Sequence, residues 1–174
     1  METLIYEGRT YVRRNGKWVD SRNMVAPEGV QRDLNREFAK QINPENLSIN
    51  DCINQGDAFK NSCSASIALK FYEKAAENAD RQTMAYLLPR ITSCYRQTGQ
   101  AQKAIDILTL ATHRFGQGMV TPVLLTSVAA AYCDLQDYAR AKKCCDRAYA
   151  SSGGKHSDEL SLVYDRIKKE TSGK

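Results

Sequence analysis

The sequence carries a pattern that recurs at a nearly constant interval through its middle part. The pattern begins at Phe59, Tyr95 and Tyr132, so successive copies are 36 and 37 residues apart. The residues nine, thirteen and sixteen positions after each aromatic are Ala68, Tyr72 and Ala75; Ala104, Leu108 and Ala111; and Ala141, Cys145 and Ala148. Self-similarity at this period is the signature of stacked repeats. It favours a short repeat array with appendages over one compact domain.

Each copy predicts a pair of antiparallel helices. In the third copy, Leu125, Val128 and Tyr132 share one face of a first helix. Ala141 and Ala148 lie two turns apart on a second helix, where small side chains permit a close helix contact. Because one helix pair cannot bury its apolar face alone, we expect the pairs to stack into a solenoid.

The stretch from about residue 49 to residue 155 resembles tetratricopeptide repeats (TPR). The best-matching runs are Gly56-Asp57-Ala58-Phe59 with Ile67-Ala68-Leu69-Lys70-Phe71-Tyr72-Glu73-Lys74-Ala75, and Ala129-Ala130-Ala131-Tyr132 with Tyr138-Ala139-Arg140-Ala141. The copies are longer than the usual 34 residues of this family. Pro89 falls inside the first helix of the middle copy, where it is expected to kink that helix or delay its start. The resemblance implies an α-solenoid that binds other proteins.

The predicted fold class is mostly α: a TPR-like solenoid with a small N-terminal β-meander and a C-terminal capping helix. The expected segments are a β-meander at 1–26, a helix and linker at 27–47, three repeats within 48–156 (about 49–82, 85–118 and 122–155), a capping helix at 157–170, and a disordered tail at 171–174. The β-meander rests on β-branched and aromatic runs that Glu7-Gly8 and Asn15-Gly16 separate.

The Asn15-Gly16 pair predicts a two-residue hairpin turn and therefore a register. Arg14 should face Lys17, Arg13 should face Trp18, and Val12 should face Val19. We expect the face that carries Ile5, Thr10, Val12 and Val19 to pack on the helices. The opposite face would then place Arg13 beside Trp18 as a cation–π pair.

The residues that usually carry catalysis or metal binding form no recognisable constellation. The sequence contains no Gly-rich phosphate loop, no Gly-x-Ser-x-Gly elbow and no His-Glu-x-x-His. The six cysteines, Cys52, Cys63, Cys94, Cys133, Cys144 and Cys145, include no Cys-x-x-Cys pair and are interpreted mostly as buried small apolar residues. We therefore expect no enzymatic activity, no cofactor and no metal.

The resemblance also implies where a partner would bind. In this family, the outward face of the first helices lines a concave groove. Carried over by position, the candidate residues are Asn50, Ile53, Asn54, Asp57 and Lys60 from the first repeat; Tyr86, Arg90, Ser93 and Arg96 from the second; and Thr126 and Ser127 from the third, together with their neighbours Val123, Ala130, Cys133 and Asp134. Their mixture of basic and apolar groups predicts an acidic, partly apolar or amphipathic peptide segment as the partner.

Two other classes of partner remain open. The basic residues Arg9, Arg13, Arg14, Lys17 and Arg22 alternate with aromatic residues in the hairpin, an arrangement suited to nucleic acid, although residues 1–24 carry a net charge of only +2. A free edge strand could instead join two copies into a homodimer. The sequence contains no apolar run long enough for a transmembrane helix, and its first residues lack a hydrophobic signal core, so we expect a cytoplasmic protein without membrane insertion.

Overall fold

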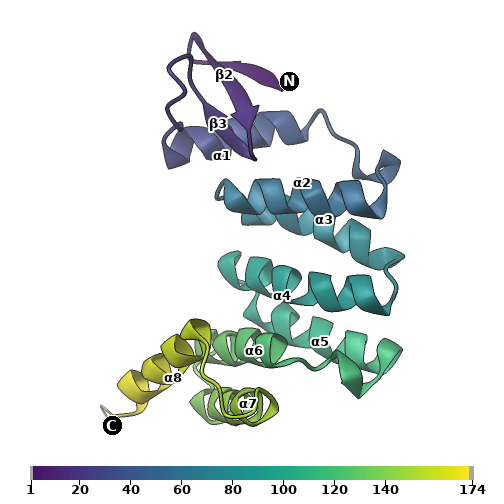
Figure 1. Ribbon diagram of the computed structural model, residues 1–174. Coiled ribbons are helices and arrows are strands. Elements are labelled where there is room, and N and C mark those ends of the chain that lie inside the picture. The colour runs from purple at the N-terminus through teal and green to yellow at the C-terminus, as the bar shows by residue number, and fades with distance from the viewer. Residues whose placement is uncertain (1, 173–174) are drawn as a thin grey trace. The chain divides into compact units, whose positions relative to one another are not determined.

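The computed structural model describes residues 2–172, which divide into two compact units between Ala79 and Asp80. The first unit contains β1 (Thr3–Tyr6), β2 (Arg9–Arg14), β3 (Lys17–Val19), α1 (Glu28–Ala39), a 3₁₀ turn (Pro44–Asn46), α2 (Ile49–Asn61) and α3 (Ala65–Glu77). The second contains α4 (Arg81–Gln97), α5 (Ala101–Phe115), a 3₁₀ turn (Gln117–Met119), α6 (Pro122–Asp134), α7 (Tyr138–Ser151) and α8 (Asp158–Thr171) (Figure 1). The predicted fold class, mostly helical with a small N-terminal antiparallel sheet, is confirmed.

The three strands form an antiparallel meander with the predicted register. Val12 faces Val19, Arg13 faces Trp18 and Arg14 faces Lys17. The turn residues Asn15 and Gly16 both have positive φ angles, of 49° and 77°, as a type I′ turn requires. The local chemistry of the turn therefore sets how β2 and β3 pair.

The predicted orientation of the sheet is wrong. Trp18 is fully buried (0% exposed) and Tyr11 lies on the same inner face, whereas Ile5 on the other face is 74% exposed. A strand alternates its side chains, so the buried aromatic face leaves Ile5 and Thr10 in solvent. The sheet packs against α1 with the face that carries Trp18, and aromatic rings are the side chains that bury the most apolar area.

The contact between the sheet and α1 is built on buried amides. The indole Nε1 of Trp18 donates to Oδ1 of Asn35 at 2.7 Å. The amide of Asn35 in turn donates to the hydroxyls of Ser62 and Ser64, at 2.7 and 2.9 Å, in the turn between α2 and α3. The side chain of Gln31 bonds both the N–H and the carbonyl of Trp18, at 3.0 and 2.7 Å. This network fixes sheet, α1 and first repeat in one arrangement.

Arg13 lies on the buried face of the sheet. Its guanidinium carbon lies 4.6 Å from the ring centre of Phe38 and 4.7 Å from that of Phe59, so the predicted cation–π contact is made with these rings rather than with Trp18. Nη1 donates to Glu2 and to Gln55, whereas Nε and Nη2 are buried without a hydrogen-bond partner among residues 2–172. Burial lowers the pKa of Arg13, and Glu2 opposes that shift. The two rings stabilise a charge that hydrogen bonds satisfy only in part.

The repeat helices pack in the predicted pairs, α2 with α3, α4 with α5 and α6 with α7. Small residues permit the close contacts: a Cβ added to Gly56 would stand 2.5 Å from the ring of Tyr72. Cys52, Cys94, Cys133 and Cys145 are buried as small apolar residues, Cys144 is half-buried, and Cys63 is exposed.

The middle repeat starts earlier than the sequence suggested. Asp80 caps α4 by accepting a hydrogen bond from the N–H of Thr83 at 2.7 Å, so the helix begins at Arg81 rather than near residue 85. The helix continues through Pro89 to Gln97, which excludes a delayed start. Pro89 has no N–H to donate to the carbonyl of Ala85, so α4 lacks this one helical hydrogen bond. The helix tolerates the missing bond at this half-exposed position.

The last repeat is covered by α8, which packs against α6 and α7 (Figure 1). Ser157 caps this helix, and Leu160, Val163 and Ile167 form its buried stripe. Thr171, expected to begin a disordered tail, ends α8, and residues 173–174 lie outside the described residues. None of the helices in the described part of the chain is both long and apolar enough to span a bilayer.

Candidate functional site

The candidate residues of the first repeat lie on the side of α2 opposite its buried stripe of Cys52, Gly56 and Phe59. Asn50 and Asn54 are exposed, whereas Ile53, Asp57 and Lys60 are half-buried. Oδ1 of Asp57 accepts a hydrogen bond from the Tyr72 hydroxyl, so this carboxylate also ties α2 to α3. Lys60 has no ion-pair partner among residues 2–172, and its charge is available to a ligand.

An exposed aromatic residue and an arginine form the most prominent feature of α4. The guanidinium carbon of Arg90 lies 3.6 Å from the ring centre of Tyr86, which is 46% exposed. Arg90 also donates to the main-chain carbonyl of Tyr86 at 3.2 Å. The two side chains are one helical turn apart, so the helix itself holds the pair in place. This stack presents a flat apolar ring and a positive charge at one point of the surface.

Arg96 has a different role from Arg90. Its Nε donates to Asp134 at 2.7 Å, and the same carboxylate accepts a bond from Arg166 of α8 at 2.6 Å. Burial raises the pKa of Asp134, but the hydrogen bonds from Arg96 and Arg166 outweigh it and hold the pKa below its ordinary value. The charge of Arg96 is therefore largely committed to joining α4, α6 and α8.

The third repeat offers less accessible surface than its sequence suggested. Thr126 is buried, and its hydroxyl donates to the carbonyl of Pro122 at 3.0 Å. The hydroxyl of half-buried Ser127 donates to the carbonyl of Val123 at 3.1 Å. On α4, Ser93 likewise accepts a bond from Gln97 of its own helix. Hydroxyls used in this way contribute little directional bonding to a partner.

Two neighbouring positions on α6 were wrongly expected to face a groove. Ala130 and Cys133 are buried, in one cluster with Leu160, Val163 and Ile167 of α8. The capping helix occupies the place that a fourth repeat would take, so it covers this side of α6. The accessible part of α6 is its first half, where Val123 is exposed.

Within the second unit, Tyr86 and Arg90 of α4 have Val123 and Ser127 of α6 as their counterparts. These residues occupy equivalent positions 37 residues apart on helices that pack against each other. We call this surface the α4–α6 patch. The five α2 residues form a separate surface in the first unit.

The basic hairpin loses the side chains that base stacking would need. Tyr11, Arg13 and Trp18 are buried in the first unit. Tyr6 is half-buried, and its hydroxyl donates to Asp33 at 2.8 Å. Arg9, Arg14, Lys17 and Arg22 remain exposed, but Arg14 donates to Asn23 and Arg22 lies 3.8 Å from Asp20. What remains is a set of surface cations without aromatic platforms, so the nucleic-acid hypothesis loses its main support.

The thiols and carboxylates of the described residues form no metal-binding group of three or more. Burial raises the pKa of Cys145 to about 12 and also raises the pKa values of Cys133 and Cys144. A thiol whose pKa is raised in this way is a poor nucleophile at neutral pH.

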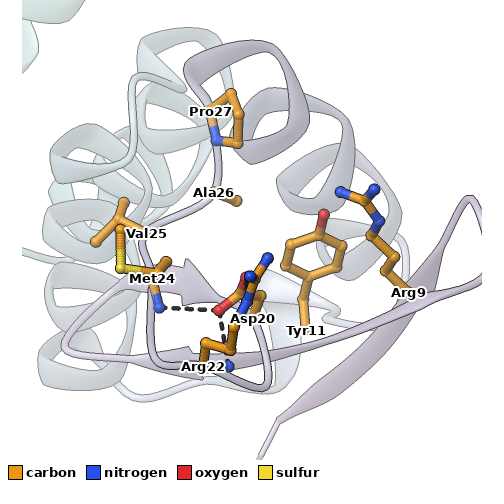
Figure 2. Close-up of a pocket in the computed structure, with 8 residues that line it drawn as sticks. All are labelled: Arg9, Tyr11, Asp20, Arg22, Met24, Val25, Ala26 and Pro27. Atoms are coloured by element: carbon orange, nitrogen blue, oxygen red, sulfur yellow. Dashed lines mark hydrogen bonds and ion pairs between the residues drawn. The ribbon is translucent and has the colours of Figure 1, made fainter.

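Sequence reasoning missed a pocket in the first unit. Arg9, Tyr11, Asp20, Arg22, Met24, Val25, Ala26 and Pro27 line a cavity of about 440 Å³ (Figure 2). These residues come from β2 and from the segment between β3 and α1, which ends at Pro27. The pocket was not predicted because the sheet was expected to pack with its other face. Tyr11 reaches the pocket only when the aromatic face points inward.

Comparisons with known proteins bear on the repeats. Neither family models nor curated proteins match the sequence. Among solved structures, the TPR domain of Sgt2 from Aspergillus fumigatus superposes with a TM-score of 0.61 at 21% sequence identity, over 71% of this chain and 79% of that chain. The chain has the TPR fold. The three helix pairs α2–α3, α4–α5 and α6–α7 are its repeats, which confirms the expectation from the 36- and 37-residue spacing.

Proposed function

We propose that this TPR protein is a non-catalytic adaptor that binds a peptide segment or a helix of another protein through the first helices of its repeats. The TPR fold supports a role in protein–protein interaction. The same proposal places the chain in the cytoplasm, where free thiols such as Cys52 and Cys145 persist.

The observation that carries the proposal is the α4–α6 patch. Tyr and Arg are the side chains most enriched at interface hot spots. Here the two side chains are stacked on each other, Tyr86 is exposed and Arg90 is half-buried, and Val123 is exposed on the neighbouring helix α6. A stacked pair loses little conformational freedom on binding, which lowers the entropic cost of the complex. Its combination of charge and apolar surface suits an acidic segment with apolar residues.

The α2 surface is a separate candidate contact surface within the first unit. Asn50 and Asn54 supply amide donors and acceptors, Ile53 supplies an apolar contact, and Lys60 supplies a positive charge. An amphipathic peptide that carries an acidic residue would complement these groups.

The test uses quantitative affinity purification with the full chain as bait. The double variant Tyr86→Ala, Arg90→Glu should lose at least one partner that the wild type retains, because it removes the ring and reverses the charge. Arg147→Glu is the matched control, since it reverses an exposed arginine on the second helix α7. Arg96→Glu is unsuitable because it would break the Asp134 network. If the double variant and the control retain the same partners, the groove proposal is wrong.

A homodimer through the sheet is a second candidate. In the described residues β1 pairs with β2 alone. The N–H of Arg13 donates to the carbonyl of Glu2, so alternation directs the backbone groups of Thr3 and Ile5 away from β2. Ile5→Pro removes one outward donor while sparing the β2 pairing. In sedimentation velocity, the wild type and Ile5→Val should form a dimer, and Ile5→Pro should stay monomeric. A wild type that stays monomeric at the highest attainable concentration would exclude the homodimer.

A further inference from the structure

The pocket of the first unit lies between β2, the turn that follows β3, and the start of α1. We infer that it binds an acidic side chain of a peptide, with a neighbouring aliphatic residue against its apolar wall. This inference goes beyond the proposed adaptor role of the repeat helices, because the site belongs to the N-terminal sheet and α1.

The floor of the pocket contains a polar group, the hydroxyl of Tyr11. The ring of Tyr11 is buried, with the residue 5% exposed, and Tyr11 lines the pocket. In Figure 2 the hydroxyl points into the space between Ala26 and Arg9. A tyrosine hydroxyl can donate a hydrogen bond to a carboxylate oxygen. A ligand oxygen at this position would accept that bond.

Two guanidinium groups stand on either side of Tyr11 in Figure 2, those of Arg9 and Arg22. The charge of Asp20 offsets one of them, which leaves the pocket with a net charge of about +1 at neutral pH. Oδ1 of Asp20 accepts bonds from the main-chain N–H groups of Arg22 and Met24, both at 2.9 Å, so this carboxylate is engaged in shaping the turn. A single ligand carboxylate matches the remaining charge and can accept paired bonds from a guanidinium.

The opposite wall is apolar and open to solvent. Met24 and Val25 are 65% and 56% exposed, whereas Ala26 is buried at the base. A cavity of about 440 Å³ lies within the usual size range of ligand sites. The exposed rim suits a side chain of a longer peptide, since the rest of the chain can continue into solvent. The apolar wall favours a neighbouring aliphatic residue.

The pocket is already formed without a ligand. Val19 and Val25 make an antiparallel bridge, and the N–H of Ala26 donates to the carbonyl of Trp18 at 2.9 Å. The N–H of Asp20 donates to the carbonyl of Met24 at 2.9 Å. These bonds tie the turn to the buried Trp18, so little ordering is required on binding.

The test is selection of random seven-residue peptides displayed on phage against the full chain. Enriched peptides should carry Asp or Glu next to Leu, Ile, Val or Met. The double variant Arg9→Gln, Arg22→Gln should bind them about tenfold more weakly or worse, since a charge-assisted bond contributes at least the 1.4 kcal/mol of one decade. Tyr11→Phe keeps the buried ring and should weaken binding about threefold.

The matched control is Lys17→Gln, Lys143→Gln, which removes two exposed cations away from the pocket and should bind like the wild type. The Tyr86→Ala, Arg90→Glu variant should also bind normally, so failure of this site and failure of the adaptor proposal are distinguishable. Selection without acidic enrichment, no selection, or equal binding by the Arg9→Gln, Arg22→Gln variant would each overturn the inference. If the Tyr86→Ala, Arg90→Glu variant loses binding of the selected peptides instead, the peptides bind to the α4–α6 patch. That result would also overturn the inference about the pocket.

Discussion

The first and the last repeat are closed at their outer sides by different physical means. The N-terminal cap, which consists of β1–β3 and α1, meets the first repeat through the buried amide of Asn35, which also binds the indole of Trp18, and through the tilted ring pair of Phe38 and Phe59. The C-terminal cap is α8 alone, and it meets the last repeat through the apolar stripe of Leu160, Val163 and Ile167.

The difference shows what each cap specifies. An apolar stripe stabilises in proportion to the area it buries and tolerates small shifts of the helix. A buried hydrogen-bonded network is stable in one arrangement, because each displaced group would leave a donor or acceptor unpaired. The N-terminal cap therefore fixes the positions of a sheet and a turn, which the pocket beside Tyr11 requires. The C-terminal cap needs only to cover α6 and α7.

Removing the indole should break the N-terminal cap. Trp18→Ala deletes a fully buried ring that packs edge-on against Phe38 at 5.6 Å, and it leaves Asn35 Oδ1 without its donor. We expect a loss of about 4 kcal/mol in the free energy of unfolding. Urea unfolding followed by circular dichroism measures it. Trp18→Phe, which keeps most of the ring, should lose clearly less; an equal loss would mean that the indole volume is not what matters.

The C-terminal cap should respond to loss of apolar volume alone. Leu160→Ala removes a buried side chain from the α8 stripe and should cost about 3 kcal/mol. Leu162 lies two residues further along α8 and is 68% exposed, so Leu162→Ala should change stability by less than about 0.5 kcal/mol. Similar losses in the two variants would show that α8 does not pack as described.

Asn35→Ala isolates the polar part of the N-terminal cap. The change leaves the indole N–H of Trp18 without its acceptor and removes the bonds that Ser62 and Ser64 accept, at a cost of about 2 kcal/mol. Trp18 is the single tryptophan, so its fluorescence reports unfolding of the first unit directly. Asn54→Ala, at an exposed position of α2, should be neutral or slightly stabilising. If Asn35→Ala and Asn54→Ala change stability equally, the buried amide network does not stabilise the N-terminal cap and the two caps do not differ in this respect.

The contrast between the caps also explains how far the sequence could lead. The repeat helices were predictable because each rests on several positions that recur together, such as Phe59, Tyr95 and Tyr132. The hairpin register was predictable from Asn15-Gly16, a local signal. The face of the sheet was not, because pattern alone suggests that a strand carrying Arg13 points toward solvent. Only the partners that α1 and the first repeat supply make that face the buried one.

The candidate site was predictable to a similar extent. Tyr86 and Arg90 are accessible on α4, as helical periodicity suggested. Ala130 and Cys133 are covered because α8, which lies about thirty residues further along the chain, packs on them. The pocket beside Tyr11 requires both that the aromatic face of the sheet is buried and that the turn at residues 20–25 folds as it does. The local sequence determines neither of these two features.

The smallest expected effect concerns the charged part of the C-terminal cap. Asp134→Asn weakens the bonds to Arg96 and Arg166 and should cost about 1 kcal/mol at pH 7, since the group is partly exposed. The folded-state pKa of Asp134 is lowered, so this stabilisation is complete above the unfolded-state pKa of about 3.9 and is lost as the pH falls through the lower, folded-state pKa. The difference between wild type and variant should therefore be constant from pH 7 to about pH 5 and shrink as the pH falls below the unfolded-state pKa. Asp165→Asn, which removes an exposed carboxylate on the same helix as Arg166, should change stability at pH 7 by less than about 0.5 kcal/mol. The network of Trp18, Gln31 and Asn35 is uncharged, so the cost of Asn35→Ala should not change over this range. A pH-dependent cost at Asn35, or a constant one at Asp134, would mean that the two caps do not differ in the way their contacts indicate.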